Sequence, residues 1–215
     1  MVARRAVMTG MVGLPLAAVL ADARLARAAA EGLETVTLTL PSGRKVSGAL
    51  ALPQTRPAPT VLLIHEWWGL NDQIKAMAAE VAKTGYVALA VDLMNGQVAA
   101  TPADAQKLMQ SVKDAEATET LTGWIDWLKH NEAGTGKVAT LGWCFGGGWS
   151  LNASLATPVD ATVIYYGRCD KTADELARLK GPVLGHFASR DKFITPAMVQ
   201  GFKENLERAE AKGKK

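Results

Sequence analysis

A cysteine between two glycines is the residue of this sequence best placed to act as a nucleophile. Cys144 lies in the segment Gly142-Trp143-Cys144-Phe145-Gly146, between a β-rich run and a helical one. This G-x-nucleophile-x-G spacing is typical of a strained strand-to-helix turn that lifts a nucleophile off the sheet. The N-terminus of the following helix would favour a thiolate, and the N–H of Phe145 would point toward a developing oxyanion. The segment therefore predicts acyl transfer through a cysteine.

The alternative is that Cys144 is a small buried apolar residue and that the glycines permit close packing of helix on sheet. The second cysteine, Cys169, has no comparable setting, and we expect it to be structural. Two cysteines exclude both a disulfide framework and a cysteine-rich zinc site.

A second candidate is a carboxylate that follows an apolar run directly. Glu66 stands in the segment His65-Glu66-Trp67-Trp68-Gly69. The two indole rings would desolvate the carboxylate, so that it could take a proton from a thiol and return it. This position is also where such an architecture places its second oxyanion donor. Alternatively, Glu66 caps a helix or pairs with a surface cation.

A third candidate is Asp191, in the segment Ser189-Arg190-Asp191 after another apolar run. The acid member of a catalytic triad lies at such a strand end, where it orients a histidine. An aspartate in a turn after a strand is as often a turn-former, and the spacing alone does not separate the two roles.

Alternating apolar runs and helical segments predict a single α/β domain around a mostly parallel sheet with an antiparallel N-terminal hairpin. The expected hairpin strands are residues 34–40 and 45–52, and the expected further strands are residues 60–64, 87–91, 137–141, 161–166 and 182–188. The expected helices are residues 73–83, 103–112, 115–130, 146–156 and 196–212. Because ligands of such sheets bind at the carboxyl ends of the strands, Glu66, Cys144 and Asp191 should share one edge.

Composition agrees with one globular domain. The chain has 215 residues, of which 48% are hydrophobic and 21% charged, and this balance excludes disordered, collagen-like and coiled-coil proteins. The net charge is +3, but the first 30 residues hold four arginines against one aspartate. The remainder is therefore neutral, and no basic face indicates a nucleic-acid partner.

The first 30 residues have the layout of an export signal. The pair Arg4 and Arg5 precedes an apolar stretch, residues 6–21, and three alanines suited to cleavage end at Ala30. The pair resembles a twin-arginine signal. We therefore expect a signal peptide at residues 1–30, one domain at residues 31–215, a periplasmic or secreted location and no stable membrane insertion. The alternative is an ordinary amphipathic first helix.

Together these residues resemble the dienelactone hydrolase family of α/β-hydrolases, from about residue 33 to the end of the chain. The G-x-C-x-G-G elbow and the H-E-x-x-G segment carry the resemblance. It implies a three-layer α/β sandwich with Cys144 as nucleophile, Glu66 as the carboxylate that activates it, and Asp191 as the triad acid. It also implies an oxyanion hole formed by the amides of Trp67 and Phe145.

Two features depart from the family. There, the triad histidine lies on a loop after a further strand beyond the last helix, whereas here the chain ends at Lys215. We therefore expect a domain that lacks the last strand, as a fragment or a natural truncation. The histidines His65, His130 and His186 do not match the family's position. No arginine occurs in residues 92–96, where family members that hydrolyse dienelactone hold its carboxylate.

The resemblance thus predicts a hydrolase of small carboxylic esters or lactones that acts through a thioester on Cys144. The alternative, which the absent histidine favours, is a small-molecule-binding protein of the same fold that has lost turnover. A redox-sensing thiol protein is a third possibility. We expect a small-molecule substrate, a monomer, and neither a cofactor nor a metal. Loop side chains decide the natural substrate, so resemblance of fold does not supply it.

Overall fold

A seven-stranded sheet forms the centre of the described part of the chain, in a computed structural model that describes residues 19 and 21–213. The strands are β1 (Glu34–Thr39), β2 (Lys45–Ala51), β3 (Ala58–Ile64), β4 (Val87–Val91), β5 (Gly134–Trp143), β6 (Ala161–Tyr165) and β7 (Val183–His186). Their order is β1-β2-β4-β3-β5-β6-β7. Strand β2 runs antiparallel to β1 and β4, and the remaining neighbours are parallel. The predicted hairpin and mostly parallel sheet are confirmed.

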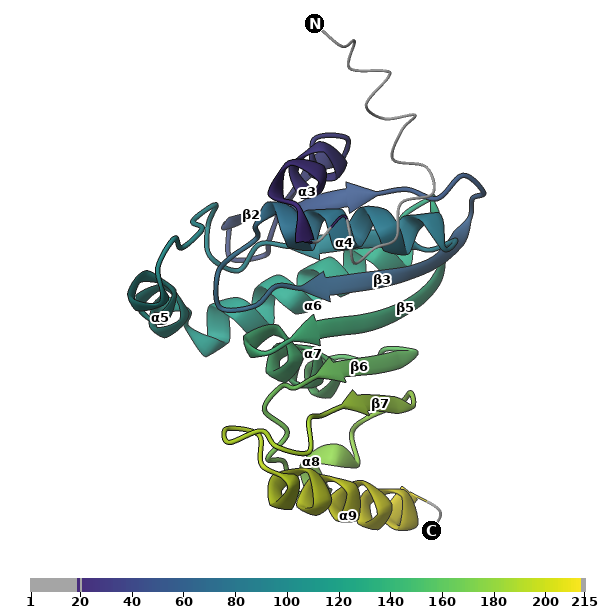
Figure 1. Ribbon diagram of the computed structural model, residues 1–215. Helices are drawn as coiled ribbons and strands as arrows, with labels where there is room; N and C mark the ends of the chain where they lie inside the picture. The colour runs from purple at the N-terminus through teal and green to yellow at the C-terminus, as the bar shows by residue number, and fades with distance from the viewer. Residues whose placement is uncertain (1–18, 20, 214–215) are drawn as a thin grey trace, which may run out of the picture.

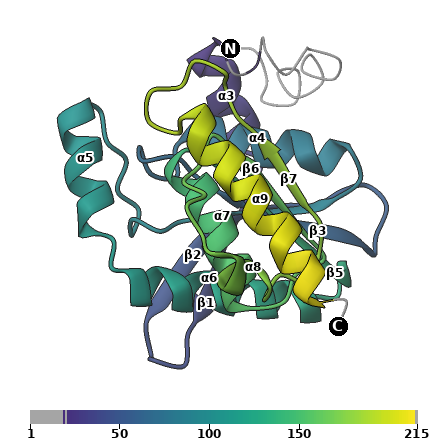
Figure 2. The same cartoon turned by 90° about the horizontal axis from the view of Figure 1, so that it is seen from below.

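Helices cover both faces of this sheet. They are α3 (Ala23–Ala30), α4 (Asp72–Lys83), α5 (Pro102–Ser111), α6 (Asp114–His130), α7 (Phe145–Ala156), α8 (Ala173–Leu176) and α9 (Pro196–Gly213). Helix α4 lies on one face and helices α6 and α7 lie on the other (Figure 1). Helices α8 and α9 lie below β7 at the end of the sheet in Figure 1, and α9 therefore lies in front in Figure 2, which is seen from below. The fold is therefore the expected three-layer α/β sandwich.

The central strands are apolar without alternation because both of their faces are covered. Every residue of β4 is buried, as are five consecutive residues of β3 up to Ile64. In the register, Ile64 pairs with Val91 of β4 and Gly142 of β5. Further along the sheet, Tyr165 pairs with His186. The parallel strands thus end together, and the loops that follow them meet at one edge.

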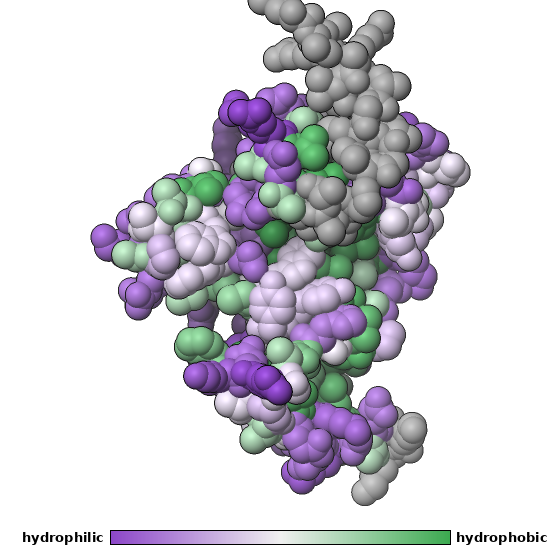
Figure 3. Space-filling model, viewed as in Figure 1, coloured by the Kyte–Doolittle hydropathy of each residue, from purple (hydrophilic) through white to green (hydrophobic). Residues whose placement is uncertain are grey.

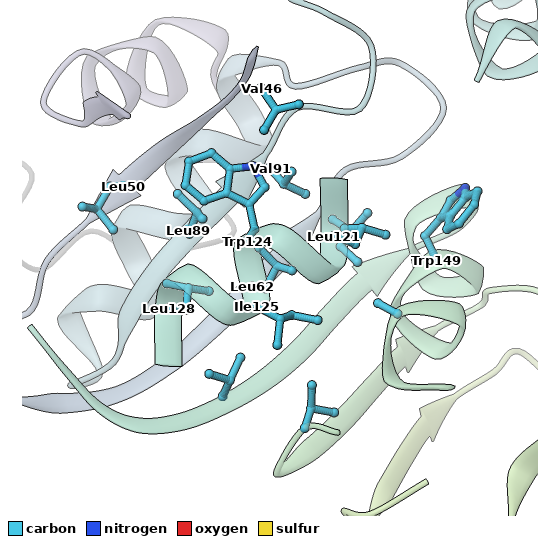
Figure 4. Close-up of a cluster of buried hydrophobic side chains, with 14 of the residues drawn as sticks. Val46, Leu50, Leu62, Leu89, Val91, Leu121, Trp124, Ile125, Leu128 and Trp149 are labelled. Carbon is cyan, nitrogen blue, oxygen red and sulfur yellow. The ribbon is translucent and has the colours of Figure 1, made fainter. Parts of the chain in front are cut away.

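The larger core cluster lies between the sheet and helix α6. Trp124 is fully buried there among Leu50, Leu89, Val46 and Val91, so that the hairpin strand β2 and the central strand β4 pack on the same helix (Figure 4). The indole N–H of Trp124 makes no hydrogen bond among the described residues, which lowers the stability that this cluster contributes. The cluster nevertheless fixes α6 behind the sheet.

The other face is covered less completely. Helix α4 covers β2, β3 and β4 through a second cluster that includes Ile74 and Ala78. Beyond it, apolar side chains of the last strands reach the surface, and Leu184 of β7 is 54% exposed. Figure 3 shows apolar surface in the lower part of the molecule, above the hydrophilic surface of α9. In the part of the chain that the structure describes, β7 is the edge strand of the sheet.

Most of the predicted export signal, residues 1–18 and 20, lies outside the described residues. The described remainder contains α3, which packs against α4 through Ala26 and Ala76, together with Val19. The side chain of Asp22 caps this helix by accepting hydrogen bonds from the N–H groups of Arg24 and Leu25. No helix among the described residues is long and apolar enough to span a membrane. The cleavage of residues 1–30 stays a prediction.

The short helix α8 and the full length of β5 were not predicted. Helix α8 is only one turn long, so it shows no hydrophobic periodicity from which a helix could be predicted. A reciprocal capping box between Thr172 and Glu175 stabilises it. Strand β5 begins at Gly134 rather than residue 137, because its polar start pairs with Ala58 of β3. Strand β7 is shorter than expected, at residues 183–186.

The contact between α7 and the sheet gives a testable prediction about stability. A Cβ on Gly146 would overlap the carbonyl oxygens of Ile64 and His65, whereas Gly201 in α9 has open space around it. We expect Gly146→Ala to lower the free energy of unfolding by about 1–3 kcal/mol or more, because backbone must move. The matched change Gly201→Ala should raise it by about 0.5–1 kcal/mol through helix propensity.

Urea unfolding of both variants measures these changes. Equal stability of the two alanine variants would show that α7 does not approach β3 as closely as described.

Candidate active site

The strand-to-helix turn holds Cys144 in a backbone conformation that few residues adopt. Its φ is 52° and its ψ is −116°, immediately before α7. The N–H of Cys144 donates to the carbonyl of Tyr165 over 3.0 Å, and the N–H of Gly147 donates to the carbonyl of Cys144 over 3.0 Å. Such strained positions persist only where surrounding contacts determine them, and they are concentrated at functional sites. The expected elbow is therefore formed.

The flanking glycines are required because backbone meets backbone around the elbow. A Cβ on Gly142 would overlap the carbonyl of Gly146, and a Cβ on Gly147 would come within 2.8 Å of the Cα of Gly167. Helix α7 thus begins in contact with the ends of β3 and β5 and with the loop after β6. The glycine spacing permits close packing and exposes the cysteine at the same time.

The thiol of Cys144 is exposed at the surface, yet its pKa is raised rather than lowered. Desolvation by neighbouring atoms is the largest cause, and the negative charges of Glu66 and Asp191 add to it. The N–H of Phe145 hydrogen-bonds the sulfur and opposes this shift. The N–H at the helix terminus thus favours the thiolate as expected, but desolvation and the two carboxylates outweigh it, so the net shift of the thiol pKa is upward. A base must take the proton when the thiol reacts.

Glu66 is held by a residue that the sequence did not indicate. The hydroxyl of Tyr166 donates a hydrogen bond to Oε1 of Glu66 over 2.9 Å. Burial and the Glu66 charge raise the pKa of Tyr166, so it remains a donor at neutral pH. Tyr166 follows β6 directly and has a φ of 38°. Sequence analysis could have found Tyr166 from its place directly after a parallel strand, because the other three candidate residues also follow parallel strands.

Asp191 forms a turn and lies close enough to Cys144 for its charge to act on the thiol. Its Oδ1 accepts hydrogen bonds from the N–H groups of Phe193 and Ile194, at 2.7 and 3.0 Å. These are the contacts of a turn-forming aspartate. Its charge nonetheless acts on Cys144. The structure therefore brings Cys144, Glu66 and Asp191 to one edge of the sheet, as the strand ends predict.

The three histidines have other neighbours. His186 ends β7 and stacks on Tyr165 with 4.4 Å between ring centroids. His130 ends α6, where its Nδ1 hydrogen-bonds the carbonyl of Asp126. His65 is fully buried beneath the candidate site. Among the described residues, none of the three hydrogen-bonds Asp191.

The amides proposed for the oxyanion hole lie on adjacent loops. Phe145 is the first residue of α7, where N–H groups lack helical partners. Trp67 lies in the turn after β3, which closes when the N–H of Gly69 donates to the carbonyl of Glu66 over 3.3 Å. The ring of Trp67 packs edge-on against Trp68. Within the described residues, the N–H of Trp67 donates no hydrogen bond.

A cavity lies away from this chemistry. Its volume is about 690 Å³, and it lies near the start of β4, lined by residues such as Leu33, Leu50, Ala82 and Gly85. Its lining holds neither a cysteine nor a histidine. The cluster of Cys144 with two carboxylates is therefore the candidate active site.

Comparison with known proteins identifies the family. The sequence matches the Dienelactone hydrolase family over residues 46–214, a range that includes every candidate site residue. The chain belongs to the dienelactone hydrolase family. Protein usf of Aquifex pyrophilus is 33% identical to it over 162 residues, which are 71% of this chain and 70% of that protein. Carboxymethylenebutenolidase of Pseudomonas putida is 26% identical over 171 residues, which are 75% of this chain and 72% of that protein.

Solved structures agree in fold. A dienelactone hydrolase-like promiscuous phosphotriesterase from metagenomic libraries superposes with a TM-score of 0.73 at 23% identity, covering 83% of this chain and 78% of that one. At this identity the likeness shows the fold alone. Family membership confirms the resemblance seen in the sequence and makes this chain a dienelactone hydrolase-like hydrolase.

The charges around Cys144 give a second testable prediction. Glu66→Gln removes a negative charge that raises the thiol pKa, and the amide oxygen can still accept the Tyr166 hydrogen bond. The thiolate should therefore form more readily, and alkylation of Cys144 by iodoacetamide near pH 7 should accelerate by roughly threefold or more. Asp191→Asn should accelerate it less, because its charge is the smaller cause.

The rate of alkylation across a range of pH measures this shift. Glu204→Gln on α9 is the matched control and should leave the profile unchanged. A slower reaction of Glu66→Gln would contradict the described arrangement of charges.

Proposed function

We propose that this chain hydrolyses small carboxylic esters or lactones with Cys144 as nucleophile. The observation that supports this most is the elbow, in which Cys144 precedes α7 at φ 52° and its sulfur accepts a hydrogen bond from the Phe145 N–H. The two carboxylates acting on the same sulfur supply proton acceptors. Membership of the dienelactone hydrolase family supports hydrolysis as the type of reaction.

In the first step, Glu66 takes the thiol proton as the sulfur of Cys144 attacks the ester carbonyl. The carbonyl π electrons move to oxygen, and the N–H groups of Trp67 and Phe145 stabilise that oxyanion. The tetrahedral intermediate then collapses. The bond from carbon to the leaving oxygen breaks, the alkoxide takes the proton from Glu66, and a thioester remains. Tyr166 keeps the Glu66 carboxylate oriented through its hydrogen bond.

In the second step, water attacks the thioester carbon and gives a proton to Glu66. The C–S bond then breaks, the carboxylic acid leaves, and the thiolate of Cys144 takes the proton back from Glu66. We assign this role to Glu66 because no histidine hydrogen-bonds Asp191 within the described residues. A carboxylate is a weaker base than imidazole at neutral pH, so we expect this step to be the slower one. The same observation favours a second candidate function, a ligand-binding protein of this fold without turnover.

The loop after β4 favours a neutral substrate. Asp92 occupies it, and its carboxylate accepts hydrogen bonds from the N–H groups of Met94 and Gly96. No arginine or lysine lies in residues 92–96 to attract a substrate carboxylate. A neutral ester or lactone therefore fits this site better than an anionic one. We further propose that residues 1–30 direct export and that the protein acts in the periplasm or outside the cell.

The time course of p-nitrophenol release from p-nitrophenyl acetate tests the proposed function. We expect the 215-residue chain to release about one equivalent in a fast phase and then to continue at a slower steady rate, because deacylation lacks a stronger base. Cys144→Ala should abolish both phases. The matched variant Cys169→Ala removes the buried thiol and should retain both.

An acetyl adduct on Cys144, seen by intact mass spectrometry after the fast phase, would identify the thioester. Equal release from wild type and Cys144→Ala would contradict the nucleophile and leave the binding function as the better explanation. Steady turnover without a fast phase would contradict slow deacylation.

A further inference from the structure

A buried imidazole lies directly beneath the candidate site. His65 has no exposed surface, although it stands between a strand and a surface loop. Both of its ring nitrogens are used. The N–H of Leu93 donates to Nε2 over 3.1 Å, and Nδ1 lies 2.5 Å from the carbonyl oxygen of Glu66. The ring therefore joins the loop after β3 to the loop after β4.

These contacts determine where the proton of the ring resides. Burial lowers the pKa of His65, and the weaker opposing effects of the Glu66 carbonyl and the Asp92 charge do not reverse this. The ring is therefore neutral at pH 7 and carries one proton. Because Nε2 accepts a hydrogen bond from Leu93, the proton must be on Nδ1. Nδ1–H thus donates to the carbonyl of Glu66.

That carbonyl belongs to the peptide whose N–H is contributed by Trp67. The peptide is trans, and in a trans peptide the C=O and the N–H point in opposite directions. Anchoring the Glu66 oxygen on a ring in the protein interior therefore turns the Trp67 N–H away from the interior, toward the surface where Cys144 lies. The Gly69 N–H, which donates to the same oxygen over 3.3 Å, supports this orientation.

The same ring also contacts the second amide donor. The rings of His65 and Phe145 stack, with 6.1 Å between centroids and 20° between planes. Phe145 contributes the N–H that hydrogen-bonds the Cys144 sulfur. One buried side chain thus contacts both segments that supply the oxyanion hole.

We propose that His65 is the positioning residue of the oxyanion hole, because its Nδ1–H holds the Glu66 carbonyl and thereby aims the Trp67 N–H at the site of reaction. This inference rests on the proposed esterase function and assigns to His65 no proton transfer. The ring acts through the peptide that it orients.

Two substitutions separate this role from a general structural one. His65→Asn keeps an N–H donor close to the position of Nδ1 and loses the acceptor at Nε2. His65→Leu has a similar volume to histidine but removes both. His130→Asn, at the exposed end of α6, is the matched control.

The rates of two reactions of Cys144 are compared in each variant, namely acylation by p-nitrophenyl acetate and alkylation by iodoacetamide. Alkylation forms no oxyanion at a carbonyl, so it reports only on the thiol.

We expect His65→Leu to slow acylation by about 100-fold, as loss of an oxyanion donor does, with alkylation within about threefold of wild type. His65→Asn should recover most of the acylation rate, and His130→Asn should alter neither rate. The inference is overturned if both rates of His65→Leu fall together, if the asparagine variant is as slow as the leucine variant, or if His65→Leu acylates normally.

A ¹⁵N NMR spectrum of the histidine rings tests the inference separately from the enzymatic function. We expect His65 to be protonated at Nδ1 and unprotonated at Nε2 at pH 7 and above. Protonation at Nε2 would overturn the inference whatever the activity. Absence of Cys144-dependent acylation in the wild type, with the expected tautomer present, would instead refute the proposed function.

Discussion

The contact between the first turn of α7 and the sheet is the constraint on which the rest of the site depends. At Gly142 and Gly146, backbone lies against backbone, with no room for a Cβ. This approach forces Cys144 into a left-handed φ and brings its sulfur to the edge where the strands end. A wider separation between α7 and the sheet would relieve the strain at Cys144, but it would also move the thiol away from the two carboxylates and from the loop after β3.

Buried polar groups fix that approach from below. Thr140 of β5, Thr162 of β6, and Ser150 and Ser154 of α7 are all buried and hydrogen-bond one another at 2.7–2.9 Å. Because an unpaired buried hydroxyl costs about 1–3 kcal/mol, this cluster favours one position of α7 on the sheet. His65 likewise favours one arrangement of the loops after β3 and β4, because its ring nitrogens hydrogen-bond both of them. Apolar packing alone would allow the helix to slide.

The electrostatic arrangement explains why the resting thiol is protonated. A cysteine at a helix N-terminus usually gains thiolate character. Here desolvation and two carboxylates outweigh the terminus and raise the pKa of Cys144. In the mechanism that we propose, the same carboxylates accept the thiol proton, so that deprotonation is coupled to attack on a substrate. Tyr166 links the end of β6 to this chemistry through Glu66.

The sequence by itself determined the α/β alternation, the hairpin, the elbow at Cys144 and the edge shared with Glu66 and Asp191. These features are local, because the periodicity of apolar residues and the spacing of glycines can both be seen within short segments of the sequence. Only the tertiary structure decided the direction of the thiol pKa, the partner of Glu66 and the tautomer of His65. Each depends on groups from distant segments, such as Tyr166, one hundred positions beyond Glu66. Their distances and desolvation exist only once the sheet has assembled.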